Sequence, residues 1–238
     1  MTNNLANAST VGYKKEGSTS QSFDDVLTVK IKDQSVGMRN VQRLGVKNPG
    51  VKIGENYTDY SQGSFRITGN TYDLALSGEG FFAIEFTNKA GETDTKYTRA
   101  GQFTLNKDGY LVTEEGDYVL DTQNRRIRLN TLIDSSITDD GTIYQNGQAV
   151  AKIQVTDFED YDYLEKYGET YYQPIQGAKT IAAKAQVKSG YLEMANVQIV
   201  SEMVNLISIT RAYESNQKVV QTIDDTLDGA VNPIGRVQ

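Results

Sequence analysis

"YLEMANVQIVSEMVNLISITRAYESNQKVVQTIDDTLD", residues 191–228, is the stretch of this chain that decides its fold. It contains neither glycine nor proline, so it predicts one continuous helix about 57 Å long at 1.5 Å per residue. Gly229 follows directly and predicts the end of that helix.

An apolar stripe runs along this helix in alternating steps of four and three residues, which is the spacing of a heptad seam. The stripe consists of Ile199, Met203, Leu206, Thr210, Tyr213, Gln217, Val220, Asp224 and Leu227, so polar residues interrupt it. A second stripe widens the apolar face over the first half and consists of Val197, Val200, Val204 and Ile207. We therefore expect a coiled-coil-type stem, although packing within one chain also satisfies this spacing.

Residues 61–190 carry the alternating pattern of β-strands. The stretch "FFAIEF", residues 81–86, places Phe82 on one face of a strand and its neighbours on the other. Turn signals at 107–109 (Lys-Asp-Gly) and 146–147 (Asn-Gly) separate alternating runs, as in β-hairpins. Such signals every ten residues or so predict an antiparallel β-sandwich or barrel-like domain.

The chain before this domain has a different composition. Residues 14–60 are polar and rich in glycine, and predict an extended connector with a few short strands. Residues 2–8 resemble the end of a helix that is too short to be stable alone, and Gly12 permits a turn after it. We expect four parts: a helix end and turn (1–13), a connector (14–60), a β-domain (61–190) and a C-terminal assembly helix (191–238).

Composition restricts the classes of function. The 238 residues include no cysteine, histidine or tryptophan, so the most frequent general base and metal ligands are missing. The formal net charge of −7 argues against binding to nucleic acid, which requires clustered lysine and arginine. No apolar run is long enough to span a bilayer, and the N-terminus lacks the pattern of a secretory signal.

Three motifs suggest chemistry but have simpler structural explanations. The acidic run "DFEDYDYLE", residues 157–165, lacks the spacing and glycine of a calcium loop. Gly78 and Gly80 are not followed by the third glycine of a dinucleotide loop. The carboxylate pairs at 114–115 and 139–140 resemble turn residues. We therefore expect no enzyme activity, no cofactor and no metal.

The two ends of the chain resemble a known family, the flagellar axial proteins of rod, hook and hook–filament junction. The N-terminal signature of that family, approximately A-N-N-L-A-N-x-x-T-x-G-Y-K, matches Asn3, Asn4, Leu5, Ala6, Asn7, Thr10, Gly12, Tyr13 and Lys14. The C-terminal signature matches Gly190, Leu192, Glu193, Asn196, Val197, Glu202, Met203, Val204, Ile207, Arg211, Ala212, Tyr213, Glu214 and Asn216. The middle, around residues 60–84 and 97–120, resembles basal-body rod proteins of the FlgF/FlgG type. The family usually has serine at the position of Ala195.

This resemblance implies a structural subunit that polymerises into the hollow, helical, torque-transmitting rod of the flagellar basal body. It implies that residues 2–8 end a longer N-terminal helix, which pairs with the C-terminal helix. The implied partners are copies of the chain, other rod and hook subunits and the flagellar export apparatus, without a cleaved signal peptide or membrane insertion. The implied subunit contacts are Asn3, Asn4, Leu5, Asn7, Gly12, Tyr13, Ile199, Met203, Leu206, Ile207, Arg211, Tyr213, Glu214, Val220 and Leu227.

Two other functions remain open at this point. One is a small hook protein or another axial subunit, which shares the terminal signatures. The other is a carboxylate-based carbohydrate-active enzyme or sugar-binding module on the β-domain, because flagellar rods cross the peptidoglycan layer. The sequence shows no convergent site for such an enzyme.

Overall fold

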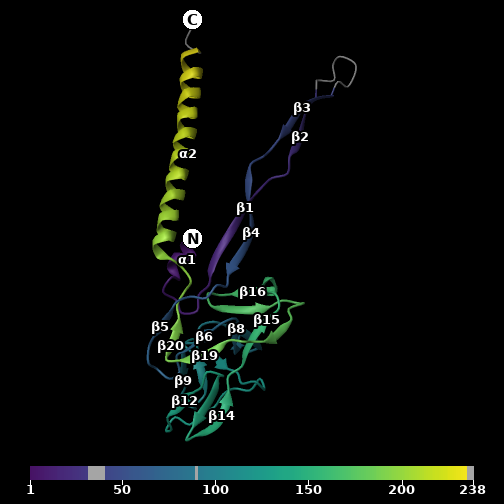
Figure 1. Cartoon of the computed structure of the whole chain (residues 1–238). Coiled ribbons are helices and arrows are strands. Elements are labelled where there is room, and N and C mark those ends of the chain that lie inside the picture. The colour runs from purple at the N-terminus through teal and green to yellow at the C-terminus, as the bar shows by residue number, and fades with distance from the viewer. Residues whose placement is uncertain (32–40, 89–90, 235–238) are drawn as a thin grey trace. The chain divides into compact units, whose positions relative to one another are not determined.

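The computed structural model describes residues 1–31, 41–88 and 91–234. These residues are mainly β, with a short N-terminal helix, α1 (Thr2–Ala6), and a long C-terminal helix, α2 (Ile199–Ile234) (Figure 1). The chain forms two compact units: Met1–Lys15 together with Tyr60–Gln238, and Glu16–Asp59.

The unit of residues 16–59 is built from two-stranded sheets. β1 (Lys15–Ser22) pairs with β4 (Val51–Asp59), and β2 (Val26–Ile31) pairs antiparallel with β3 (Val41–Lys47). The ring of Tyr57 lies against Gly17, where an added Cβ would come within 2.4 Å of the ring. Such a ribbon buries little, so apolar side chains such as Ile53 remain exposed.

The other unit contains a sheet of nine strands. Its main path is β16 (Leu164–Tyr167), β17 (Tyr171–Pro174), β8 (Thr93–Thr98), β7 (Phe81–Thr87), β11 (Tyr118–Val119), β10 (Leu111–Thr113) and β9 (Phe103–Leu105). β15 (Val155–Phe158) pairs with β7 and also with the edge strand β18 (Thr180–Ala182). All pairings recorded within this sheet are antiparallel.

Three small sheets complete this unit. They are β12 (Ser135–Ile137) with β13 (Thr142–Gln145) and β14 (Gln148–Lys152), β6 (Leu74–Ser77) with β19 (Gln186–Ser189), and β5 (Phe65–Ile67) with β20 (Tyr191–Glu193). A short 3-10 helix, η1 (Tyr161–Tyr163), precedes β16. The described residues contain no closed barrel, so the domain is sandwich-like rather than barrel-like.

Both predicted hairpins are confirmed. β9 and β10 pair with Leu105 opposite Leu111, and Gly109 between them has a φ of 82°. β13 and β14 are joined by Asn146 and Gly147, whose φ values of 50° and 77° are those of a type I′ turn. Asparagine and glycine tolerate positive φ better than other residues, which explains why the sequence signal is reliable here.

The core lies on both sides of β7. Phe82 packs with Phe103 and other apolar residues in one cluster, whereas Phe81 and Ala83 belong to a second cluster that contains Tyr172. All five side chains are at least 99 % buried. The alternation in residues 81–86 therefore separates two cores rather than a core from solvent.

The predicted C-terminal helix is confirmed, but its bounds differ from the prediction. The helix begins at Ile199, because Tyr191–Glu193 form strand β20 against β5 and the Glu193 side chain is fully buried. It also continues past Gly229, which is exposed and meets no neighbouring atom. A glycine inside an exposed helix costs only about 1 kcal/mol relative to alanine, so it does not end this one.

Candidate assembly surface

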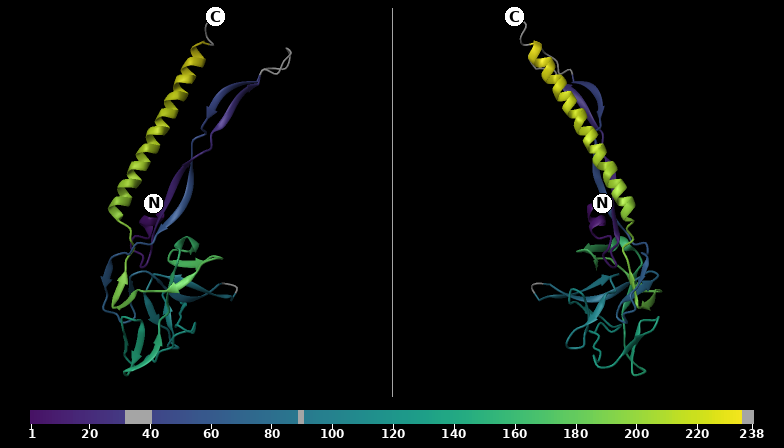
Figure 2. Two further views of the ribbon diagram at one scale, coloured as in Figure 1. Left: turned by 45° about the vertical axis from the view of Figure 1, so that its right-hand side comes forward. Right: turned by 90° about the vertical axis from the view of Figure 1, so that its left-hand side faces the viewer.

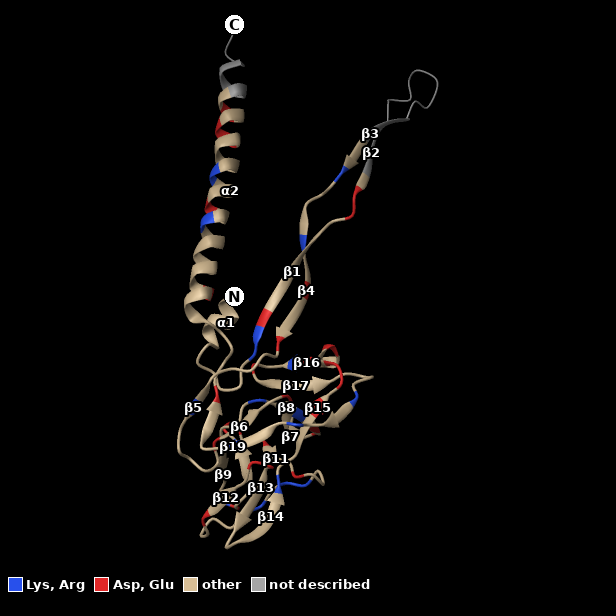
Figure 3. Cartoon of the chain, in the orientation of Figure 1, with Lys and Arg blue, Asp and Glu red and all other residues tan. Residues whose placement is uncertain are grey.

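Helix α2 exposes apolar side chains along its length. Twelve large apolar residues on it are between 37 % and 75 % exposed: Ile199, Val200, Met203, Val204, Leu206, Ile207, Ile209, Tyr213, Val219, Val220, Ile223 and Leu227. Charged residues are sparse on the helix, which is mostly tan in Figure 3. Every predicted contact residue on α2 is therefore accessible to another chain, including Arg211 and Glu214.

The apolar side chains of α2 are not confined to one stripe. At about 100° per residue, Val219 and Ile223 lie on the side of the helix opposite the line through Ile199, Met203 and Leu206. A helix with apolar residues on several sides is typically buried by neighbours on several sides.

The first turn of α2 is fixed to the N-terminal segment. The Glu202 carboxylate is 3 % exposed, and its Oε1 lies 2.7 Å from the Lys15 Nζ. The hydrogen bond from Lys15 holds the pKa of Glu202 below its ordinary value, against the opposing effect of burial. α1 and the start of α2 lie side by side in all three views (Figures 1 and 2).

The predicted contact residues of the N-terminal segment divide into exposed and buried ones. Asn3 is exposed, Leu5 is half-buried, and Asn7 donates a hydrogen bond to Glu169 Oε2 at 2.7 Å. Asn4 and Tyr13 are at least 99 % buried, and the Tyr13 hydroxyl donates to Asn4 Oδ1 at 3.0 Å.

Gly12 brings the N-terminal segment close to the β-domain. Its φ is 70°, and an added Cβ would lie 2.3 Å from the backbone nitrogen of Ala100. Its N–H donates to the backbone carbonyl of Glu193 at 2.8 Å. Both the turn and the close approach therefore require glycine at this position.

Sequence reasoning missed the residues that join the two ends of the chain. Lys14 and Glu193 form an ion pair with 2.7 Å between Nζ and Oε1, and their side chains are 1 % and 0 % exposed. Arg99 joins them from the end of β8, with its Nη1 3.3 Å from Glu193 Oε2. Lys14 and Glu193 lie within the matched signatures, so that match was their only signal; nothing in the sequence singled out Arg99.

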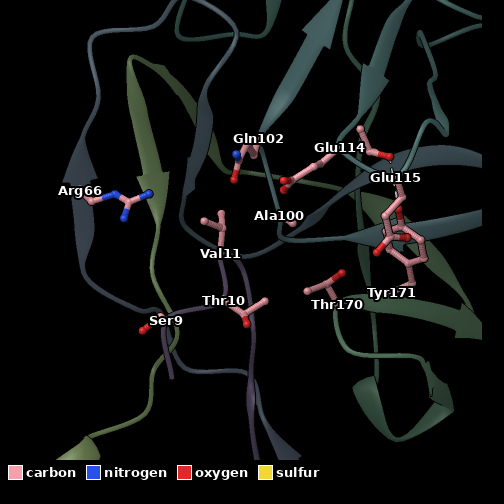
Figure 4. Close-up of a pocket in the computed structure, with 11 residues that line it drawn as sticks. Ser9, Thr10, Val11, Arg66, Ala100, Gln102, Glu114, Glu115, Thr170 and Tyr171 are labelled. Atoms are coloured by element: carbon pink, nitrogen blue, oxygen red, sulfur yellow. Dashed lines mark hydrogen bonds between the residues drawn. The ribbon is translucent and has the colours of Figure 1, made fainter. Parts of the chain in front are cut away.

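A hollow of about 450 Å³ lies beside the N-terminal segment (Figure 4). Arg66 on β5 extends toward it from one side, and Glu114 in the turn after β10 extends toward it from the other. Tyr171 on β17 also lines it, and burial raises the pKa of this hydroxyl, which donates to Asp117 Oδ2 at 2.9 Å. The hollow therefore offers charges of both signs and a protonated phenol.

The acidic run at residues 157–165 is used in local structure. Asp157 accepts a hydrogen bond from the Tyr161 hydroxyl at 2.7 Å, and Asp160 accepts one from the N–H of Asp162 at the start of η1. Glu159 pairs with Lys179 at 3.2 Å. Across residues 1–31, 41–88 and 91–234, no three carboxylates gather as metal ligands would. Within those same ranges, no helix combines the length and apolar character needed to cross a membrane.

Two family models match this chain. The model of the flagellar basal body rod FlgEFG protein C-terminal region matches residues 188–232, which include β20 and most of α2. The model of the flagellar hook protein FlgE/F/G D1 domain matches residues 75–147. Both matched regions lie in the unit that contains the nine-stranded sheet.

Curated relatives match over nearly the whole chain. The flagellar basal-body rod protein FlgG of Bacillus subtilis (strain 168) is 34 % identical over 249 residues, covering 97 % of this chain and 90 % of the relative. The flagellar basal-body rod protein FlgF of Caulobacter vibrioides is 32 % identical over 237 residues, covering 99 % and 90 %. The flagellar hook-basal body complex protein FlhO of Bacillus subtilis (strain 168) is 29 % identical over 251 residues, covering 100 % and 92 %.

Proposed function

Because this chain belongs to the flagellar basal-body rod proteins of the FlgF/FlgG type, and is a structural subunit of that rod, we propose that it polymerises through helix α2 into a hollow helical shaft. The shaft transmits torque from the motor to the hook. The observation that carries this proposal is the set of exposed apolar side chains on several sides of α2.

The energetics of α2 favour packing against neighbouring chains. Its twelve large apolar side chains are about half exposed. Covering the exposed half in an interface contributes about 1 kcal/mol of binding free energy per side chain. This gain of about 10 kcal/mol is comparable with the cost of about 4–15 kcal/mol for fixing one chain against another. A subunit of a helical polymer contacts several neighbours, and these additional contacts favour assembly over the free chain.

The proposed contact residues are the accessible ones among those that the family resemblance implies, so Asn4, Gly12 and Tyr13 are left out. On α2 they are Ile199, Met203, Leu206, Ile207, Arg211, Tyr213, Glu214, Val220 and Leu227; in the N-terminal segment the accessible ones are Asn3, Leu5 and Asn7. Aromatic and arginine side chains frequently supply much of the energy of an interface. Tyr213, 69 % exposed, and Arg211 are therefore the strongest candidates.

The chain is a flagellar basal-body component, and its family associates with other axial subunits of the flagellum. Beyond this, its proposed partners are copies of itself, the adjoining rod and hook subunits and the flagellar export apparatus. Export without a cleaved signal peptide delivers it to the rod within the cell envelope. The proposed role requires no catalysis, cofactor, metal, nucleic acid or membrane insertion.

Purified hook–basal bodies from the source bacterium test this proposal. We expect mass spectrometry to find the chain in the rod fraction, and we expect deletion of its gene to give basal bodies that lack a complete rod. A plasmid copy restores the rod, whereas a copy with Leu206→Glu and Tyr213→Glu does not. Intact basal bodies from the deletion strain would contradict the proposal.

A further inference from the structure

The Glu193 carboxylate joins four segments of the chain. Its Oε1 accepts hydrogen bonds from Lys14 Nζ at 2.7 Å and from the N–H of Gly63 at 2.9 Å. Its Oε2 lies 3.3 Å from Arg99 Nη1. Lys14 belongs to the N-terminal segment, Gly63 precedes β5, Arg99 directly follows β8, and Glu193 lies on β20.

A second group of polar contacts surrounds the start of α2. Asn196, three residues before the helix, accepts from the N–H of Lys15 at 2.7 Å. The same side chain donates to the backbone carbonyl and the hydroxyl of Ser61 at 3.1 and 3.0 Å. Inside the helix, Glu202 pairs with Lys15 Nζ at 2.7 Å. The segment that enters α2 is therefore held before and after Ile199.

We propose that these contacts form a mechanical joint, which we call the clasp: Lys14, Lys15, Arg99, Glu193, Asn196 and Glu202. The clasp makes helix α2 and the β-domain turn as one body. This inference rests on the proposed function, because it supplies the step by which torque passes between the helix and the β-domain of one subunit.

The chemistry of the clasp suits a joint better than it suits a source of stability. Replacing a buried ion pair by apolar residues is frequently neutral or stabilising, so stability alone does not explain charges at Lys14 and Glu193. The hydrophobic effect is non-directional, so it does not by itself fix the orientation of one element against another. Charge-assisted hydrogen bonds fix distances and angles, and the buried Glu193 carboxylate receives three of them.

The clasp also gives the buried part of the N-terminal signature a role. The bond from Tyr13 to Asn4 and the turn at Gly12 shape the segment that presents Lys14 to Glu193. Asn4, Gly12 and Tyr13 thus act as positioning residues within one subunit, whereas the exposed residues of α2 contact its neighbours.

Hydrogen exchange on the purified full chain gives the first test. Lys14→Met removes a buried partner of Glu193, and Asn196→Ala removes contacts that are less buried. We expect both variants to raise amide exchange in residues 194–205 at least tenfold. The protection of β7 and β8 is unchanged in Asn196→Ala, and in Lys14→Met it falls less than that of residues 194–205, because loss of a buried partner of Glu193 also lowers global stability. The matched control is Lys179→Met, which breaks an exposed ion pair, with side chains 76 % and 62 % exposed, and leaves exchange unchanged.

Motor rotation at high and low load gives the readout that a merely stabilising role would not change. With basal bodies assembled in normal number, we expect the Asn196→Ala strain to match wild type at low load and to rotate more slowly at high load. Rotation equal to wild type at every load, or unchanged exchange in residues 194–205, would contradict the proposal that the clasp is a mechanical joint. If Lys14→Met fails to fold, the exchange and rotation of Asn196→Ala alone test the proposed joint. Absence of the wild-type chain from basal bodies would instead contradict the proposed function.

Discussion

The substitution Gly12→Ala tests the close approach between the N-terminal segment and the β-domain. At a φ of 70°, alanine costs about 1 kcal/mol in backbone strain. Its Cβ would lie 2.3 Å from Ala100 N and 2.5 Å from Arg99 C, and these are backbone atoms that cannot rotate away. Relief of such overlap costs about 1–3 kcal/mol and stretches the bond from Gly12 N–H to the Glu193 carbonyl. We expect a total loss of about 3 kcal/mol in the free energy of unfolding.

Gly168 provides the matched control for this prediction. Its φ is 69°, nearly the same as that of Gly12, but no atom lies within 4 Å of its added Cβ. Gly168→Ala should therefore cost only the backbone strain, about 1 kcal/mol. Urea denaturation of the two variants and the wild-type chain measures the difference. If the two losses agreed within about 0.5 kcal/mol, the packing of residues 10–14 against the β-domain would be refuted.

Three further predictions concern the N-terminal segment and helix α2. Tyr13→Phe should lower the free energy of unfolding by about 1 kcal/mol, because the buried Asn4 side chain loses its bond from the hydroxyl; Tyr57→Phe, at an exposed ring, is the control in urea denaturation. Glu202 has a folded pKa below its usual 4.5, so its contribution to stability is present above pH 4.5 and disappears as the pH falls through the folded value. The loss of stability between pH 7 and pH 3 should thus be smaller in Glu202→Gln than in wild type, and an equal loss would contradict this. Leu206→Glu should leave the stability of the isolated chain within about 0.5 kcal/mol of wild type yet reduce the number of assembled basal bodies, counted by electron microscopy.

Local patterns in the sequence predicted much of the fold. Asn146 and Gly147 identified a hairpin because a type I′ turn needs positive φ at both positions, a requirement that is independent of the rest of the chain. The lack of glycine and proline and the apolar spacing of residues 191–228 likewise predicted the long helix α2. The division of the chain into four parts is not settled by these local patterns and stays a prediction.

Tertiary contacts determined what the sequence could not predict. Tyr191–Glu193 have no glycine or proline to mark them as distinct from the helix, and they form a strand only because β5 pairs with them. Arg99 carries no local signal, because its role comes from Glu193, 94 residues away in the chain. Polar residues in buried clusters are therefore the part of this site that needs a structure.

Cysteine cross-linking within assembled basal bodies is the most direct test of the central claim, that α2 joins neighbouring subunits. The chain contains no cysteine, so Tyr213→Cys introduces a single thiol at a position that is 69 % exposed in the isolated subunit. We predict that a maleimide–diazirine reagent, attached at this thiol and then irradiated, forms a covalent link to another axial subunit in purified hook–basal bodies, and that the unassembled chain takes up the same reagent and stays a monomer. A thiol that remains freely labelled and uncross-linked in assembled basal bodies would contradict the account.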